Sequence, residues 1–157
     1  NVKKGFIDKQ KFVVTNILRE KILMGYKPKI VIEKMSDIIG WGVVVEEDIY
    51  KGQFVGEYVG VVKKKTRFVI KRNMYCMSYT THPVSNPYVI DAKDIGNFTR
   101  FINHSSNPNL NLVSVIVDGL IHMIFFANQD ISKSSQLTFD YGDGFWDDFK
   151  THNQQMI

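Results

Sequence analysis

From Lys29 onward the chain consists of short runs rich in β-branched and aromatic residues, and turn residues separate each run from the next. This alternation restricts the fold more than any other feature, because each run has the length and composition of a strand. The runs are KIVIEKM, GVVVEE, QFVGEYVGVV, YVIDA, LVSVIVDG, LIHMIFFA and QLTFDYG. The residues that break them are Asp37, Gly40, Gly52, Asn86-Pro87, Asn107-Pro108 and Asp118-Gly119. The pattern predicts one mostly-β domain of many short strands.

Two local signals add detail to this prediction. The stretch FVVTNILREKILM, residues 12–24, spaces its apolar residues by three and four, which predicts a helix that Gly25 and Pro28 end. The runs LVSVIV and LIHMIFF are joined by Asp118-Gly119, a pair that accepts the positive φ of a tight turn. We therefore expect a short helical N-terminal flank and, later in the chain, a β-hairpin.

The composition is that of a globular domain: of 157 residues, 44% are hydrophobic and 23% are charged. No apolar run approaches the roughly 20 residues that a membrane helix needs. The chain starts at Asn1 without a signal-peptide pattern, and we interpret it as a piece of a longer polypeptide. The single cysteine, Cys76, excludes an internal disulfide framework and a cysteine-rich zinc site, and the histidines lack metal-ligand spacing.

The net charge of +4 is modest, but its distribution is uneven. No carboxylate occurs between Glu57 and Asp91, and that interval opens with a basic run, whereas acidic residues gather near the end of the chain. Each group is either a solvated face or a surface for a partner of opposite charge. The basic run contains Lys63, Lys64, Lys65, Arg67, Lys71 and Arg72, and the acidic group contains Asp140, Asp143, Asp147 and Asp148.

Several familiar chemistries do not fit the sequence. Gly40-Trp41-Gly42 opens like a dinucleotide-binding fingerprint, but position 45 is valine and the stretch continues as a strand. Ser105 and Ser106 lie beside His104 without a G-x-S-x-G elbow, so a serine hydrolase is not indicated. Asp140 and Asp143 could form an acid–base pair, but three-residue spacing after a strand fixes no separation between them.

Four segments acquire meaning only in combination. They are Gly40-Trp41-Gly42 followed by GQFVGEYVG, then YVIDA, then RFINHSSNPN, and finally LTFDYGDGFW. In order and spacing they resemble the SET-domain protein lysine methyltransferases, over residues 29–148. RFINHS-x-NPN and LTFDYG are the most specific segments.

The resemblance implies a β-clip-like fold of several small sheets with a C-terminal pseudoknot, in which the segment LTFDYG passes by the loop NHSSNPN. Residues 1–28 would be a helical flank, residues 29–142 the SET domain and residues 143–157 a C-terminal flanking segment. The loop holds more hydrogen-bonding side chains than a connection needs, and we expect them to satisfy backbone groups of the two crossing segments. For Asn107 and Asn109 we favour this structural role.

The resemblance also implies a site for S-adenosylmethionine and no metal. The backbone at Asn103-His104 would meet the adenine, and the Asn103 side chain the methionine ammonium. Arg100 and Tyr88 would lie near the carboxylate. Gly40-Trp41-Gly42 would present backbone to the methionine part, because glycine permits a close approach.

Tyr141 matches the tyrosine that these enzymes place at the point of methyl transfer. A lysine amine attacks the sulfonium methyl in line, so the site must align two reactants and exclude water. Tyr75 matches an aromatic residue of the lysine channel. Phe139 matches a position that limits the product state, where phenylalanine predicts di- or trimethylation; the alternative is that Phe139 is only a core residue.

The sequence departs from the family pattern after the NHS motif. Ser106 stands where many relatives have cysteine, and no Cys-x-Cys cluster follows Trp146, so the post-SET zinc site is absent from this sequence. Phe145 and Trp146 are predicted to cover the adenine and close the channel, since aromatic planes stack on both groups. Packing in a C-terminal core is an equally good interpretation. Gln136 replaces a glutamate at a position that we expect to face solvent.

SET enzymes bind an extended peptide as an added strand, and the acidic C-terminal residues would suit a basic histone tail. The G-F-W form of the last segment favours histone H3, and the basic run could contact nucleosomal DNA nonspecifically. The expected localisation is then the nucleus, or a secreted effector could act in a host nucleus. The alternatives are a non-histone protein substrate, a catalytically silent SET binding module, and a basic nucleic-acid binder.

Overall fold

A computed structural model of the protein describes residues 15–70, 73–79 and 87–142. In this part of the chain strands predominate over helices, which confirms the mostly-β prediction and agrees with the SET fold. The helical elements are α1 (Asn16–Leu23), α2 (Arg67–Ile70) and the 3-10 helix η1 (Phe98–Phe101). The strands are β1 (Ile30–Ser36), β2 (Gly40–Val45), β3 (Phe54–Glu57), β4 (Val61–Lys64), β5 (Cys76–Ser78), β6 (Tyr88–Asp91), β7 (Asn103–His104), β8 (Leu110–Val117), β9 (Leu120–Ala127) and β10 (Thr138–Phe139).

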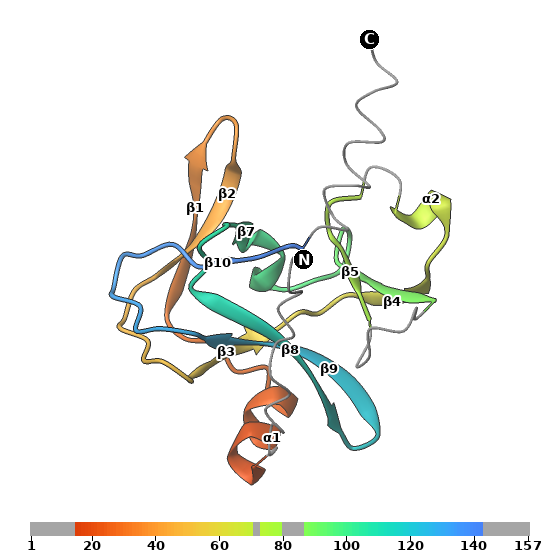
Figure 1. Ribbon diagram of the computed structural model, residues 1–157, viewed down its shortest axis with the longest axis horizontal. Helices are drawn as coiled ribbons and strands as arrows, with labels where there is room; N and C mark the ends of the chain where they lie inside the picture. The colour runs from red at the N-terminus through yellow and green to blue at the C-terminus, as the bar shows by residue number, and fades with distance from the viewer. Residues whose placement is uncertain (1–14, 71–72, 80–86, 143–157) are drawn as a thin grey trace, which may run out of the picture.

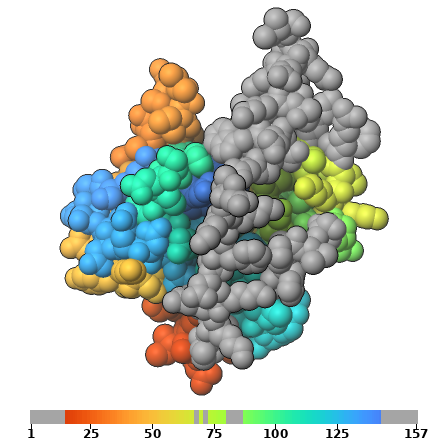
Figure 2. All heavy atoms as spheres, in the orientation of Figure 1, coloured from red at the N-terminus to blue at the C-terminus, as the bar shows by residue number. Residues whose placement is uncertain are grey.

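These strands form four small sheets (Figure 1). The hairpin β1–β2 is one sheet and projects from the body of the molecule, as the space-filling view in Figure 2 also shows. Two three-stranded antiparallel sheets have the orders β3-β9-β8 and β4-β6-β5. The fourth sheet pairs β7 with β10 in parallel. That last pair joins segments far apart in the sequence.

Helix α1 confirms the predicted N-terminal helix in its described part. Thr15 caps the helix, because its hydroxyl accepts a hydrogen bond from the Leu18 amide at 3.2 Å. Gly25 follows the helix with a φ of +63°, which glycine adopts readily. Leu18 and Ile22 pack in an apolar cluster with residues of the sheet β3-β9-β8. Among the described residues, no helix is long and apolar enough to cross a membrane.

The predicted hairpin is present as β8 and β9, which pair from Leu110↔Ala127 to Val117↔Leu120. Its turn residues Asp118 and Gly119 have φ values of +50° and +82°. Both values are positive, as the Asp-Gly pair predicted. The Asp118 carboxylate also pairs with Arg19 of α1 at 2.6 Å, which ties the hairpin tip to the helix.

The run QFVGEYVGVV was predicted as one strand, and the structure corrects this prediction. The run divides into β3 and β4, which belong to different sheets. Gly60 lies just before β4, and a Cβ atom there would stand 2.6 Å from the Asp91 carbonyl oxygen. The chain can therefore change sheets at this point only because Gly60 has no side chain.

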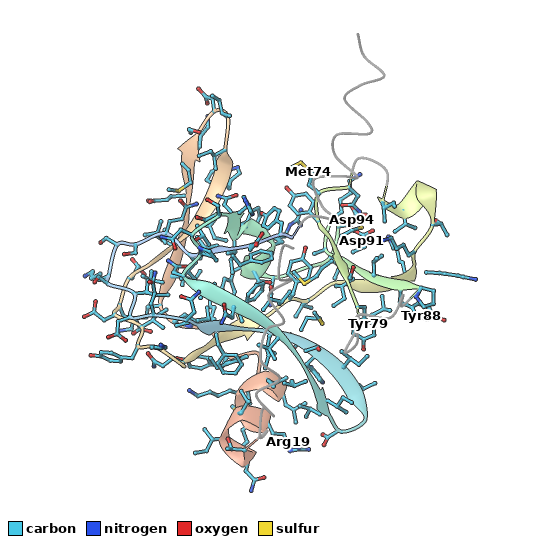
Figure 3. The ribbon with its side chains drawn as sticks, viewed as in Figure 1. Arg19, Met74, Tyr79, Tyr88, Asp91 and Asp94 are labelled. Atoms are coloured by element: carbon cyan, nitrogen blue, oxygen red, sulfur yellow. The ribbon has the colours of Figure 1, made fainter. Side chains whose placement is uncertain are left out.

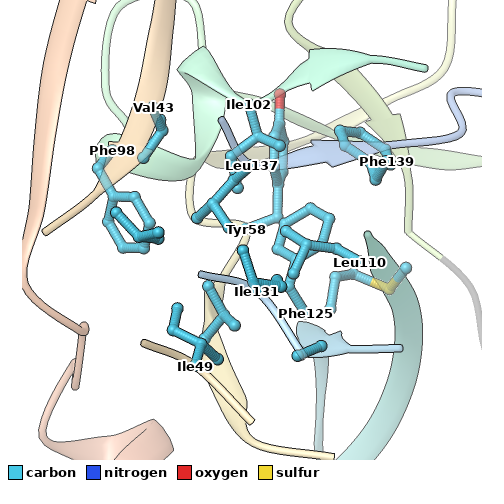
Figure 4. Close-up of a cluster of buried hydrophobic side chains, with 14 of the residues drawn as sticks. Val43, Ile49, Tyr58, Phe98, Ile102, Leu110, Phe125, Ile131, Leu137 and Phe139 are labelled. Atoms are coloured by element: carbon cyan, nitrogen blue, oxygen red, sulfur yellow. The ribbon is translucent and has the colours of Figure 1, made fainter. Parts of the chain in front are cut away.

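The main core lies between the two three-stranded sheets and the β7–β10 pair (Figure 4). Phe125 and Leu137 are fully buried at its centre, and Ile102 is 1% exposed. Burying such side chains contributes roughly 1.5–3 kcal/mol each. Since Ile102 and Leu137 immediately precede β7 and β10, the core fixes the place where these two strands meet.

Gly60→Ala is expected to destabilise the domain by about 2 kcal/mol, because the clash is with backbone of β6 that cannot move aside. Urea denaturation followed by circular dichroism measures the change. Lys51→Ala, on an exposed turn, is the control and should leave the midpoint unchanged. An unchanged midpoint for Gly60→Ala would contradict the close approach.

Candidate active site

The loop RFINHSSNPN and the segment LTFDYG lie side by side. Asn103 pairs with Thr138, and His104 pairs with Phe139. The Ser105 amide donates to the Phe139 carbonyl at 3.1 Å and extends the contact. The arrangement expected from the sequence, with two segments crossing beside each other, is therefore present.

Asn109 fastens this crossing with both ends of its side-chain amide. Its Nδ2 donates to the Gln136 carbonyl at 2.8 Å, and its Oδ1 accepts from the Thr138 amide at 2.9 Å. One side chain thus satisfies backbone groups on either side of Leu137, which is the structural role predicted for Asn109. The Asn107 backbone amide donates to the Ser105 hydroxyl at 3.1 Å, a bond within the loop itself.

His104 links the same loop to Tyr141. The Tyr141 amide donates to His104 Nδ1 at 3.2 Å, and the two rings meet edge to face at 5.4 Å. Because Nδ1 accepts this bond, a neutral His104 carries its proton on Nε2. Asp140 Oδ1 lies 3.6 Å from Nδ1, too far for a hydrogen bond, and its side chain is largely exposed.

The Tyr141 hydroxyl points back to the chain before the loop. It donates to the Ile102 carbonyl at 2.9 Å, while the phenol oxygen keeps the chemical capacity to accept. Burial, and to a lesser extent the nearby Tyr75 phenol, raises the pKa of Tyr141 to about 12. Tyr141 is therefore a neutral phenol at pH 7, suited to orienting a group rather than to removing a proton.

Phe139 connects the core to Tyr141. Its ring centroid lies 4.9 Å from that of Phe125 and 4.7 Å from that of Tyr141. The side chain is 7% exposed and belongs to the main core, which is the alternative interpretation, while its role in limiting the product state stays a prediction. The rings of Phe125, Phe139 and Tyr141 thus pack in a row, each in contact with the next.

The sequence interpretation missed Tyr58, which lies on the other side of Phe125. Tyr58 is 5% exposed, and its hydroxyl donates to the Tyr75 carbonyl at 2.8 Å. Burial raises the pKa of Tyr58 well above its ordinary value, and the next contribution comes from Tyr141. The signal in the sequence was a tyrosine inside a short β-rich run, GEYVG, since a buried phenol needs a polar partner.

Tyr75 and Arg100 form the next part of the site. The Arg100 guanidinium lies 4.3 Å from the centroid of the Tyr75 ring, a cation–π contact, and 5.2 Å from that of Phe101. Arg100 Nε is buried and has no hydrogen-bond partner among the described residues. A buried N–H without an acceptor favours binding of an anionic or carbonyl oxygen.

The structure does not bring Tyr88 to Arg100, contrary to expectation. Strand β6 begins at Tyr88 and reaches Tyr75 only at Ala92, whose amide donates to the Tyr75 carbonyl at 3.0 Å. At about 3.3 Å per residue, Tyr88 lies roughly 13 Å along the strand from that contact. In Figure 3 Tyr88 lies beside Tyr79, to which its carbonyl is hydrogen bonded, and away from Asp91. Tyr75, and not Tyr88, lies against Arg100.

Gly40-Trp41-Gly42 joins the site through Asn103, whose Nδ2 donates to the Trp41 carbonyl at 3.1 Å. Gly40 has a φ of +79°. A Cβ atom on Gly42 would stand 2.6 Å from the Met35 side chain and 2.8 Å from Gln136 Nε2, so the backbone is closely packed there. Gln136 is half-buried, contrary to the expectation that it faces solvent.

Two further predictions concern the C-terminal segment and metal binding. Phe145 and Trp146, predicted to cover the adenine, lie outside the described residues. Within the described ranges, no three His, Cys, Asp or Glu side chains gather as they would around a metal ion. Burial raises the pKa of the Cys76 thiol to about 11, so it stays protonated at neutral pH.

The family model of the SET domain matches residues 40–142 of this chain. Histone-lysine N-methyltransferase SUV39H1 of Xenopus laevis is 36% identical over 126 residues, covering 74% of this chain and 30% of that protein. The H3 lysine-36 specific histone-lysine N-methyltransferase of Candida albicans is 36% identical over 110 residues, covering 68% and 13%. Histone-lysine N-methyltransferase NSD3 of Mus musculus is 38% identical over 111 residues, covering 65% and 7%.

This chain spans less than a third of the length of each of these relatives. The matched family segment nevertheless covers more than half of the chain and contains every described residue of the site. It runs from Gly40-Trp41-Gly42, where Gly42 packs against Met35, to Tyr141 beside His104. The chain therefore belongs to the SET-domain family.

Proposed function

We propose that this domain transfers a methyl group from S-adenosylmethionine to a lysine side chain of a protein. The observation that carries the proposal is the pairing of β7 with β10, which sets Tyr141 against the Asn103-His104 loop. Relatives of this chain are named histone-lysine N-methyltransferases, which supports the same reaction.

The described residues fit the methyl donor. Arg100 Nε is a buried donor without a described acceptor, and a carboxylate would supply one. The closely packed backbone at Gly42 and the Asn103 side chain would border the methionine part, with Asn103-His104 toward the adenine. The bound donor supplies an electrophilic methyl group on a sulfonium.

The residues of the chain act by positioning the lysine amine. Model lysine has a pKa near 10.4, and an apolar channel beside a sulfonium lowers it, so that more of the amine is neutral. Tyr75 and Phe139 would line the channel, and Tyr58 fixes Tyr75 through the hydrogen bond to its carbonyl. The neutral Tyr141 phenol would orient the amine and exclude water.

The proposed substrate is a histone H3 tail bound as an extended strand. The names of the relatives support a histone, and one of them specifies lysine 36 of H3. The proposed localisation is therefore the nucleus, with a secreted effector acting in a host nucleus as the alternative. A non-histone protein substrate and a catalytically silent binding module are the alternative functions.

Tyr141→Phe is expected to lower methyl transfer at least about a hundredfold, because the phenyl ring keeps the packing but loses the group that orients the amine. Labelled methyl transfer to nucleosomes, separated core histones and a peptide array measures the activity, and calorimetry with S-adenosylhomocysteine measures binding.

Tyr50→Phe, on an exposed side chain outside the site, is the control. Transfer only to non-histone peptides would replace the histone proposal. Binding of the by-product without transfer to any substrate would favour the silent module.

We further propose that the product is di- or trimethyl-lysine, because Phe139 faces Tyr141 with a hydrocarbon ring. Phe139→Tyr is expected to shift the product toward monomethyl-lysine, since an added hydroxyl holds a water where a larger ammonium group would sit. Mass spectrometry of a peptide after long incubation reads the product. Wild-type protein that stops at one methyl would contradict the proposal.

We also propose that Lys64 and Lys65 contact nucleosomal DNA. Both are exposed, whereas Lys63 is engaged with the buried Asp91 at 2.6 Å. The double variant Lys64→Gln/Lys65→Gln should weaken DNA binding about tenfold and reduce its salt dependence by about two phosphate contacts.

Titration of duplex DNA at several salt concentrations measures this effect. Lys29→Gln/Lys133→Gln removes two exposed charges elsewhere and should leave the affinity within about twofold. Equal losses for both double variants would show that only net charge matters. DNA binding without any methyl transfer by the wild-type protein would favour the nucleic-acid binder.

A further inference from the structure

Tyr75 lies in a turn just before β5, outside the strand itself. Its neighbour Met74 is 56% exposed, so the turn lies at the surface. The position of the Tyr75 ring nevertheless has to be fixed, because the Arg100 guanidinium stacks on it at 4.3 Å. The Ala92 amide, at the end of β6, holds the Tyr75 carbonyl, and side-chain contacts hold the rest of the turn.

The turn is held through Asn73, whose side-chain amide makes two different bonds. Oδ1 accepts from the Tyr75 amide at 3.1 Å, and Nδ2 donates to Asp91 Oδ1 at 2.8 Å. The first bond closes a local turn of the kind that asparagine favours. The second bond connects that turn to the neighbouring sheet.

Asp91 is a fixed point in this sheet. It ends β6 and pairs with Val61 on one side and with Cys76 on the other. The residue is 6% exposed, and a buried carboxylate is tolerated only when donors surround it. Figure 3 shows Asp91 on the sheet beneath the turn that carries Met74.

Three donors supply the Asp91 carboxylate. Lys63 Nζ donates to Oδ2 at 2.6 Å, and the Lys93 amide joins Asn73 at Oδ1, at 3.0 Å. Burial raises the pKa of Asp91, but the hydrogen bonds from Lys63, Asn73 and Lys93 outweigh it and leave the pKa below its ordinary value. Asp91 is thus ionised at neutral pH and accepts strong, charge-assisted bonds.

We propose that Asp91 and Asn73 form a positioning relay that fixes Tyr75 against Arg100, and through this contact directs the buried Arg100 guanidinium toward the carboxylate of the methyl donor. The relay rests on the proposed function, because its output is binding of that carboxylate. Neither Asp91 nor Asn73 touches the reacting atoms. Of the parts of the donor, only the amino-acid end depends on them.

The test compares two ligands, S-adenosylhomocysteine and 5′-methylthioadenosine, which lacks the amino-acid part. Asn73→Ala should weaken binding of S-adenosylhomocysteine about tenfold, since it removes a charge-assisted hydrogen bond, and leave 5′-methylthioadenosine binding unchanged. Calorimetry, with competition for the weaker ligand, gives both dissociation constants. Met74→Ala changes an exposed side chain of the same turn and should alter neither.

A second variant tests the bond to Asp91 separately. Asn73→Asp keeps an acceptor for the Tyr75 amide but sets a second carboxylate against Asp91 Oδ1, so it should weaken S-adenosylhomocysteine at least as much as Asn73→Ala. Equal weakening of both ligands by Asn73→Ala, or unchanged binding of S-adenosylhomocysteine by Asn73→Asp, would overturn the relay.

A measurement on the free protein separates the relay from the proposed function. The Arg100 Nε–H signal in a ¹⁵N NMR spectrum should be shifted by the Tyr75 ring current, and Asn73→Ala should move it toward the position of a free arginine. A shift that Asn73→Ala leaves in place would overturn the relay alone. Wild-type protein with the shifted signal but without binding of S-adenosylhomocysteine would overturn the proposed function and the carboxylate-directing output together.

Discussion

The structure depends on one short contact, the parallel pairing of β7 with β10. A ladder of two residues per strand is weak by itself, because a few backbone hydrogen bonds cannot offset the entropy of bringing distant segments together. Asn109 supplies two further hydrogen bonds across the crossing, and His104 accepts a hydrogen bond from the Tyr141 backbone amide. Ile102 and Leu137 anchor the two strands in the core. If this crossing were lost, nothing would keep Tyr141 beside the Asn103-His104 loop.

The row of rings from Phe125 through Phe139 to Tyr141 makes the core continuous with the site. Packed interiors transmit displacement, because they contain few voids that could absorb it. Substitutions at Phe139 therefore change stability and channel shape together. This connection explains why the sequence allowed Phe139 to be interpreted either as a core residue or as a site residue: its ring packs in the core and also lies against Tyr141.

The sequence predicted features that depend on neighbouring residues. The Asp118-Gly119 turn and the helix end at Gly25 follow from backbone preferences, and the structure confirms both. The division of QFVGEYVGVV, in contrast, depends on the approach of Gly60 to Asp91, and no local pattern encodes that contact. Tyr88 was predicted beside Arg100, where Tyr75 lies, for the same reason: the pairing of β5 with β6, which no local pattern encodes, sets Tyr75 at this end of the sheet.

The tyrosines of the site have a common electrostatic consequence. Burial raises the pKa of Tyr141 and of Tyr58, and each pKa is raised further by a second tyrosine nearby, so both phenols are polar but uncharged. A carboxylate in the same place would favour the protonated form of a substrate lysine, which cannot attack a methyl group. Phenol and carbonyl oxygens can orient a neutral amine without that penalty. For the proposed reaction, neutrality of the lining is thus as important as its shape, and Asp140, the acidic neighbour of His104, stands with its side chain largely in solvent.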